Sequence, residues 1–109
     1  EGLTAECFLA ASKAGVIDEV ADSLDASQTT MGWKDQAGYN IERMTTHGIR
    51  RAAEMREAAK TLIDLGIEPE MTMGTIKRQL DLGRLDISLR NLQGFDARIV
   101  ALQNALSTK

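Results

Sequence analysis

The chain has 109 residues, which is enough for one domain with one hydrophobic core. Hydrophobic residues make up 43% of it and aromatic residues only 4%, so the core must be built from Ala, Leu, Ile, Val and Met, as in helices that pack closely through small residues. The formal net charge is −3, whereas nucleic-acid-binding domains usually carry a basic excess, and no apolar run approaches the roughly 18–20 residues of a membrane span.

The first predicted helix runs from about Leu3 to Ala14. Its apolar residues fall at i, i+4, i+7, i+8 and i+11, which is one helical stripe: Leu3, Cys7, Ala10, Ala11 and Ala14. Gly15 follows and can adopt the left-handed conformation that ends a helix. Because Cys7 lies on this stripe, we expect it to be a small buried hydrophobic residue rather than a reactive thiol.

Two further helices are predicted before residue 46. A short one runs from about Ile17 to Leu24, with an inner face made by Ile17, Val20, Ala21 and Leu24. After a polar connection, a third helix runs from about Trp33 to Thr45. We expect Trp33 to anchor packing; contact with a ligand or a partner is the alternative.

The stretch from Thr46 to Pro69 reads as one helix with a well-defined end. Its apolar face is Ala52, Met55, Ala59, Leu62 and Ile63, spaced at i, i+3, i+7, i+10 and i+11. Gly66 fits the left-handed position just past the helix, and Ile67 can fold back on Leu62 in a Schellman ending. Pro69, the only proline, blocks continuation.

A fifth helix is predicted to start at Met71 and Thr72, to reach about Leu82 and to end at Gly83. Thr72 has the chemistry of an N-cap, and Met71 can staple onto Ile76.

The last segment, Asp86 to Ser107, has apolar residues at helical spacing, and Gly94 can bend or break it. No alternating strand pattern is found in the sequence. The chain is therefore predicted to be an all-α bundle of five to seven helices.

One basic stripe could carry chemistry. Arg43, His47, Arg50 and Glu54 are spaced at i, i+4, i+7 and i+11, and Arg51 flanks them. If the third and fourth helices are continuous, these side chains share a face and could bind a phosphate or a carboxylate, because Arg presents a planar fork of donors.

The alternative for this stripe is a solvated helix face. Glu54 can pair with Arg50 or Arg51, and exposed pairs of this kind contribute only a few tenths of a kcal/mol. A helix break at Thr45, Thr46 or Gly48 would also scatter the stripe.

The sequence lacks the residues that a metal site, a glycine-rich phosphate loop or a disulfide would require. His47 is the only histidine, and no cluster of metal-ligating residues surrounds it in the sequence, so no metal site is expected. Neither GxGxxG nor GxxxxGK[ST] occurs. Cys7 is the only cysteine, which excludes an internal disulfide and fits a reducing compartment; no signal peptide is found, and we expect a cytoplasmic protein.

The run RRAAEMREAAKTLIDLGIEPEM, with His47 just before it, resembles a family signature. The family is the C-terminal NAD-binding helical domain of 6-phosphogluconate-dehydrogenase-like proteins, in the β-hydroxyacid dehydrogenase superfamily. The similar motifs are Arg-Ala-x-Glu-Met at 51–55 and Leu-Gly-x-x-Pro at 65–69. The opening EGLTAECFLAASKAGVIDEVADSL also resembles that domain, so the likeness covers Glu1 to about Gly83.

The resemblance implies that residues 1–109 form a single helical domain, the C-terminal part of a longer chain whose upstream Rossmann domain binds NAD or NADP. Such proteins pass a hydride between the nicotinamide and a hydroxy or keto carbon of a small acid, in the cleft between the domains, and commonly dimerise. The fragment alone would be inactive, because the catalytic lysine, typically in a Lys-Gly-Leu context, would lie upstream of Glu1; Lys13 does not match that context.

The resemblance also implies site residues. Other members carry a Lys-Asp pair where this chain has Arg51 and Ala52. The expected substrate- or cofactor-binding residues are His47, Arg50, Arg51 and Glu54. The alternative function is a stand-alone helical interaction module without catalysis, which binds a partner through an apolar groove.

Overall fold

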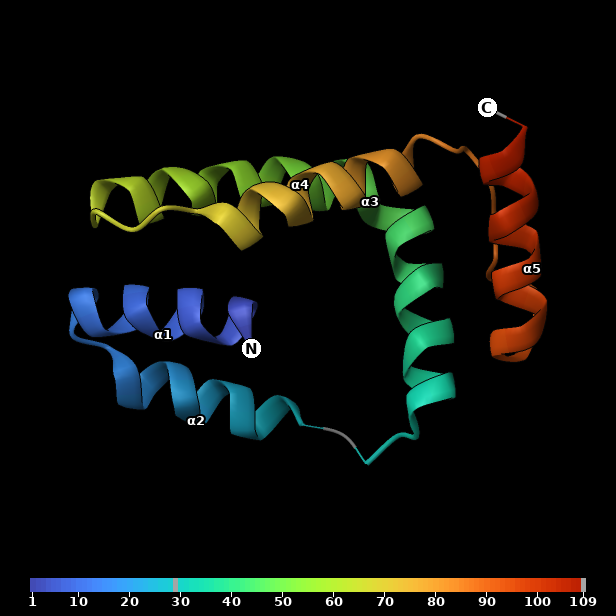
Figure 1. Cartoon of the computed structure of the whole chain (residues 1–109). Coiled ribbons are helices and arrows are strands. Elements are labelled where there is room, and N and C mark those ends of the chain that lie inside the picture. Colours follow the sequence, from blue (N-terminus) through green and yellow to red (C-terminus); the bar gives the residue numbers. More distant parts are fainter. Residues whose placement is uncertain (29, 109) are drawn as a thin grey trace.

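A computed structural model describes residues 1–28 and 30–108 of the chain. This part of the protein consists of helices and connections without a strand, so the predicted all-α bundle is confirmed. The five helices are α1 (Gly2–Ala14), α2 (Ile17–Ser27), α3 (Trp33–Asp64), α4 (Glu70–Gly83) and α5 (Gly94–Ser107) (Figure 1).

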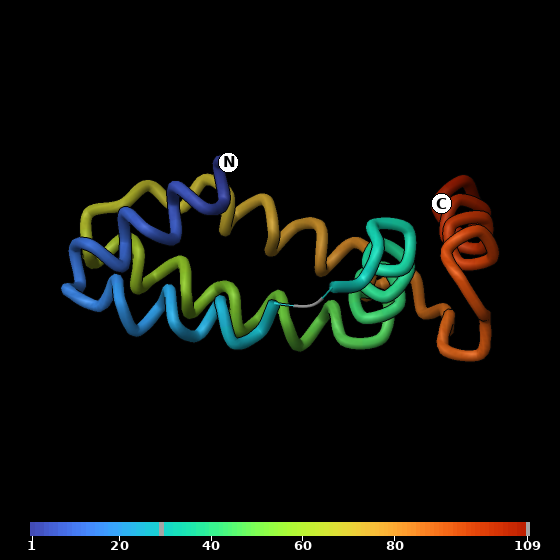
Figure 2. The backbone as a smooth tube through the Cα atoms, turned by 90° about the horizontal axis from the view of Figure 1, so that it is seen from below, coloured from blue at the N-terminus to red at the C-terminus, as the bar shows by residue number. Residues whose placement is uncertain are grey.

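The helices form an open arrangement. Figures 1 and 2 show α1, α2, α4 and the later part of α3 side by side toward one end of the molecule, and the beginning of α3 and α5 toward the other. The radius of gyration is 15.7 Å, whereas a compact domain of this length has about 13 Å. The accessible surface is 7618 Å², whereas a compact monomer of this mass exposes about 6,000 Å². Much apolar surface therefore stays uncovered within the chain.

Helix α1 begins and ends close to where it was predicted. Gly15 has φ 72°, and its amide donates to the carbonyl oxygens of the last turn, which confirms the predicted ending. The apolar stripe is buried only in its middle, at Ala10 and Ala11, while Leu3 is 57% exposed. Cys7 is only partly buried, so the prediction that its side chain is buried is wrong. The reason is that few elements cover α1.

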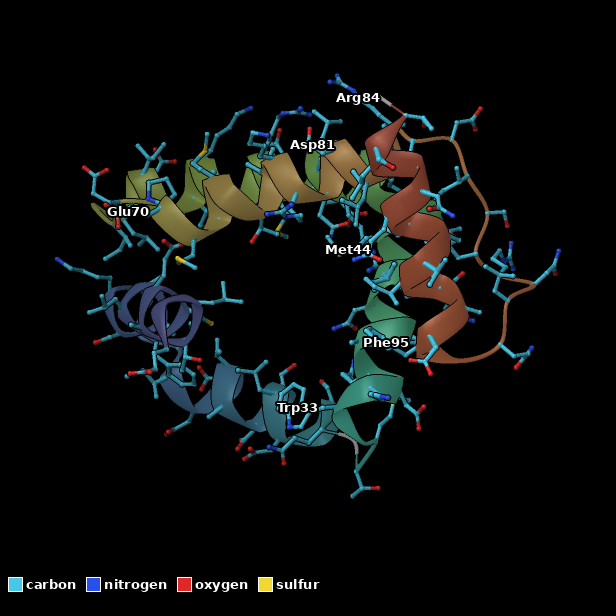
Figure 3. The ribbon with its side chains drawn as sticks, turned by 45° about the vertical axis from the view of Figure 1, so that its right-hand side comes forward. Trp33, Met44, Glu70, Asp81, Arg84 and Phe95 are labelled. Carbon is cyan, nitrogen blue, oxygen red and sulfur yellow. The ribbon has the colours of Figure 1, made fainter. Side chains whose placement is uncertain are left out.

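Helix α3 is one continuous helix, where two were predicted. Thr45, Thr46 and Gly48 do not interrupt it. Instead α3 bends sharply (Figure 1), close to Met44 (Figure 3), and we call the parts before and after the bend its first and second arms. The Thr45 hydroxyl donates to the Glu42 carbonyl oxygen at 3.0 Å. Threonine bonding back to the preceding turn is a known cause of helix bending.

The core is the contact between the second arm of α3 and α4. It is built from small residues and one isoleucine, Ala52, Ala59 and Ile76, all buried. At Gly48 and Gly83 the two backbones touch: a Cβ built on Gly48 would lie 2.9 Å from the Gly83 nitrogen. Small residues thus permit the close approach that the composition predicted.

The end of α3 is as predicted. Gly66 has φ 78°, and the Ile67 amide donates to the Leu62 carbonyl oxygen at 2.9 Å, the Schellman pattern. Ile63 was predicted on the buried face but is 60% exposed, so that assignment is wrong. Ile63 lies on the same side of α3 as Ala52 and Ala59, but in the last turn of the helix, where the neighbouring elements leave most of its side chain uncovered.

Helix α4 begins differently from the prediction. It starts at Glu70, so Thr72 lies inside the first turn and is not its N-cap. The Thr72 amide and hydroxyl instead donate to the carboxylate of Glu6 in α1. Met71 is 45% exposed, so no buried staple with Ile76 forms.

Helix α5 is shorter than the predicted Asp86–Ser107 segment, because it begins at Gly94 with φ 82°. Arg98 attaches it to the first arm of α3: its Nη1 donates to the Gly38 carbonyl oxygen and its Nε to the Leu92 carbonyl oxygen, both at 3.1 Å. Phe95 lies beside the first arm (Figure 3), and a Cβ on Gly38 would lie 3.1 Å from its Cα.

Trp33 does not anchor packing, contrary to the prediction. Its side chain is 88% exposed at the start of α3. The end of α2 lies nearby (Figure 3) but leaves the indole uncovered. The indole is therefore accessible to solvent.

Candidate functional site

The basic stripe stays together because α3 is continuous. A helix advances about 100° per residue, so residues 43, 47, 50 and 54 share one side of it. The buried positions Thr45, Gly48 and Ala52 define the opposite, packed side. The predicted scattering by a helix break does not occur, and the stripe lies along and just after the bend.

His47 lies at the centre of this cluster and is partly buried. Burial lowers its pKa below the ordinary value of 6.5, and the positive charges of Arg43, Arg50 and Arg51 lower it further, against a smaller opposing effect of Glu42. The neutral form of the imidazole therefore predominates at pH 7. It offers one N–H donor and one acceptor nitrogen within the field of three guanidinium groups.

Arg50 and Glu54 form the ion pair expected of a solvated face. The Arg50 Nη1 to Glu54 Oε1 distance is 3.3 Å, and both side chains are more than half exposed, at 62% and 57%. Such a pair contributes only a few tenths of a kcal/mol. Glu54 therefore neutralises part of the charge at Arg50. It does not neutralise Arg51, which is partly buried and has no ion pair within residues 1–28 and 30–108.

Arg43 is the member of the stripe that stands out structurally. Its guanidinium carbon lies 5.9 Å from the centre of the Tyr39 ring, a cation–π arrangement. Its Nε is buried and lacks a hydrogen-bond partner in the described part of the chain. A buried donor without an acceptor is rare and costly. Its spacing of four residues from His47 placed it in the stripe, but it was not among the predicted binding residues.

Glu42 is a second feature that the sequence did not reveal. Its side chain is 10% exposed, and its Oε1 accepts a hydrogen bond from the Thr46 hydroxyl at 3.1 Å. The Nε of Arg90, in the connection before α5, lies 4.0 Å from the same oxygen. Glu42 thus places one carboxylate near the basic stripe, and this carboxylate offsets part of the positive charge around His47.

Within residues 1–28 and 30–108, no group of three or more His, Cys, Asp or Glu side chains could hold a metal ion. None of the helices described combines the length and apolarity required to cross a bilayer.

Comparison with known proteins identifies a family. The model of a domain of unknown function, DUF1932, matches residues 11–82, from the last turn of α1 to the end of α4. No curated protein and no solved structure matches the chain. The matched residues include the whole of α3, and with it the basic stripe. The chain therefore belongs to the DUF1932 family, a helical domain found in 6-phosphogluconate-dehydrogenase-like proteins.

Proposed function

We propose that the chain is the C-terminal substrate domain of an NAD(P)-dependent oxidoreductase that acts on a small hydroxy or keto acid. An upstream Rossmann domain would bind NAD or NADP, and the basic stripe of α3 would form one wall of the cleft between the domains. The observation that carries this proposal is the arrangement of three guanidinium groups around a neutral, partly buried His47 on one continuous helix.

The residues fit an anionic group. Arg43 has a buried Nε without an acceptor, and Arg51 has no ion pair among the described residues. A substrate carboxylate or a cofactor phosphate would bind the guanidinium groups of this cluster, because Arg binds such groups with parallel N–H donors. His47 would donate one further hydrogen bond. Arg50, paired with Glu54, would act through its charge rather than through direct contact.

Hydride transfer itself would belong to the cofactor and the upstream lysine. The chain's own residues would bind and orient the acid, which lowers the entropy cost of bringing its carbon to the nicotinamide. We therefore expect the isolated chain to lack oxidoreductase activity.

The test uses His47, the only histidine, as an NMR probe. Its pKa is measured in the isolated chain with inorganic phosphate and, separately, with pyruvate. A bound anion favours the imidazolium form, so the proposal expects the pKa of His47 to rise. Arg51→Ala should weaken this response, whereas Arg56→Ala, an exposed arginine of the same helix outside the cluster, should leave it unchanged. A His47 pKa that stays constant up to tens of millimolar of either anion would show that the stripe binds no anion and is a solvated helix face.

A stand-alone interaction module is the second candidate. The observation that favours it is the exposed apolar surface, which includes Trp33 and Leu24. In the full-length protein, Arg51→Ala separates the two candidates. If the chain is the substrate domain of an enzyme, the substitution should lower kcat/KM and leave the melting temperature unchanged. If the chain is an interaction module, the protein should have no dehydrogenase activity that the substitution could lower.

A further inference from the structure

Gln79, on α4, carries a buried hydrogen-bond acceptor without a donor. Its side-chain oxygen, Oε1, is buried and accepts no hydrogen bond from residues 1–28 and 30–108. Buried polar atoms in proteins are usually paired, because an unpaired one loses its hydration without compensation. A methionine of nearly the same size would fill this position without that cost. The amide therefore calls for an explanation other than the stability of the free chain.

The packing of α3 against α4 places Gln79 beside the basic stripe. The second arm of α3 and α4 run side by side in opposite directions, and Gly48 lies against Gly83 (Figure 1). Each helix rises about 1.5 Å per residue, so Ala52 and Gln79 lie at the same level, one turn from these glycines. Successive residues turn by about 100°, in opposite senses around antiparallel axes, so Arg51 and Gln79 fall on the same side of the contact.

The burial of Arg51 agrees with this position. Arg51 is partly buried, whereas Arg50, one residue earlier on the same helix, is exposed. The Arg51 side chain forms no hydrogen bond and no ion pair with the part of the chain that the structure describes. A guanidinium group without an acceptor and a buried acceptor without a donor therefore lie on one side of the same helix contact.

We propose that Gln79 is the positioning residue for Arg51 in the anion site, an inference that rests on the proposed function. When a carboxylate or a phosphate binds, the Arg51 guanidinium turns so that one edge faces the anion while another N–H donates to Gln79 Oε1. Arginine can make both contacts at once, because it has five N–H donors in a fixed plane. The hydrogen bond to Gln79 is absent from the free chain, so its formation adds to anion affinity rather than to stability.

The first part of the test is Gln79→Met, which keeps the size of the side chain and removes the strong acceptor. The affinity for inorganic phosphate is measured through the NMR signal of His47. The variant should bind phosphate about tenfold more weakly, because one hydrogen bond to a charged group is lost. Its melting temperature should stay the same or rise, since an unpaired buried acceptor is removed. An unchanged phosphate affinity, or a lower melting temperature, would overturn the proposal.

Gln103→Met is the matched control. Gln103 is exposed in α5, far along the chain from both arms of the anion site, and its substitution should leave the phosphate affinity unchanged. Equal weakening by Gln79→Met and Gln103→Met would overturn the proposal, because the effect would then not depend on the position of the amide.

The second part determines whether Gln79 acts through Arg51. Gln79→Met is combined with Arg51→Ala, which leaves Arg43 and Arg50 to attract phosphate. In this background Gln79→Met should cause no further weakening, because both substitutions remove the same interaction. Equal weakening with and without Arg51 would overturn the positioning role, which a purely structural effect of Gln79 would produce.

The outcome for the unsubstituted chain separates this inference from the proposed function. If phosphate leaves the His47 signal unchanged in the unsubstituted chain, the anion site is absent and both proposals fail. If the unsubstituted chain and Gln79→Met respond to phosphate equally, the anion site stands and only the role of Gln79 is overturned.

Discussion

The carboxylate of Glu6, in the middle of α1, accepts hydrogen bonds from the backbone amide and the hydroxyl of Thr72, at 2.9 and 2.5 Å, in the first turn of α4. It also accepts the Met71 amide at 2.8 Å. The first turn of a helix has amides without intrahelical partners and a positive end of its dipole, so a carboxylate stabilises it. Glu6 thus caps α4 from a different helix and holds α1 against it.

We predict that Glu6→Gln lowers the free energy of unfolding by about 1–3 kcal/mol, because an amide side chain cannot accept all three hydrogen bonds and carries no charge. Urea unfolding followed by circular dichroism measures this. The control is Glu68→Gln, since Glu68 is exposed in the connection before α4 and its substitution should change stability by less than about 0.5 kcal/mol. Equal effects of the two substitutions would show that the cap is unimportant.

Stability should also depend on pH through Glu6. Burial raises its pKa, but the hydrogen bonds from the Thr72 hydroxyl and from the amides of Met71, Thr72 and Glu70 outweigh burial and lower the pKa below the ordinary value of 4.5. The unfolded chain therefore binds this proton more readily. The stabilisation is fully present above pH 4.5 and is lost as the pH falls through the lowered folded pKa. The difference in unfolding free energy between wild type and Glu6→Gln should shrink in acid; a constant difference would contradict this.

A pair of glycine substitutions tests the contact of α3 with α4. Gly48→Ala should destabilise the fold by about 1–3 kcal/mol or more, because the new methyl group meets the Gln79 carbonyl oxygen and the Gly83 backbone. Gly74→Ala, within α4, meets nothing within 4 Å and should stabilise by about 0.5–1 kcal/mol. Thermal unfolding of both variants measures the contrast. If Gly48→Ala leaves the stability unchanged, α3 and α4 do not approach each other as closely as described at Gly48 and Gly83.

The positive charges around His47 should control its pKa. Burial and the charges of Arg43, Arg50 and Arg51 lower the pKa of His47, so removing one charge by Arg43→Ala should raise it toward 6.5. NMR titration of the single imidazole measures this without assignment by mutation. Arg84→Ala, an exposed arginine after α4, serves as the control and should leave the pKa unchanged. Equal shifts in both variants would point to net charge rather than to proximity.

Features of the fold that depend on neighbouring residues could be predicted from the sequence. The end of α3 follows from Gly66 and Pro69, which act within one turn. The all-α fold follows from the helical spacing of apolar residues, which is also a local pattern. The basic stripe was recognised from its spacing, and its binding role stays a prediction.

Features that depend on distant residues could not be predicted. Glu6 and Thr72 are 66 positions apart, and nothing near Thr72 indicates that its hydrogen-bond acceptor lies in α1. Trp33 was expected inside because large aromatic residues usually pack, but whether other helices reach it is decided by the bend in α3. Likewise Arg43 is set apart by its unpaired Nε, which only the packing around it reveals.

The way α1 is attached has a consequence for how the chain opens. The main contacts of α2 are with α1, and those of α1 with the rest of the molecule are with α4, whereas α3, α4 and α5 share the larger contacts. Opening of the α1–α2 pair therefore leaves the remaining helices intact, so hydrogen exchange should divide the chain into two cooperative units. The amides of α1 and α2 would exchange together and first, and those of the second arm of α3 last.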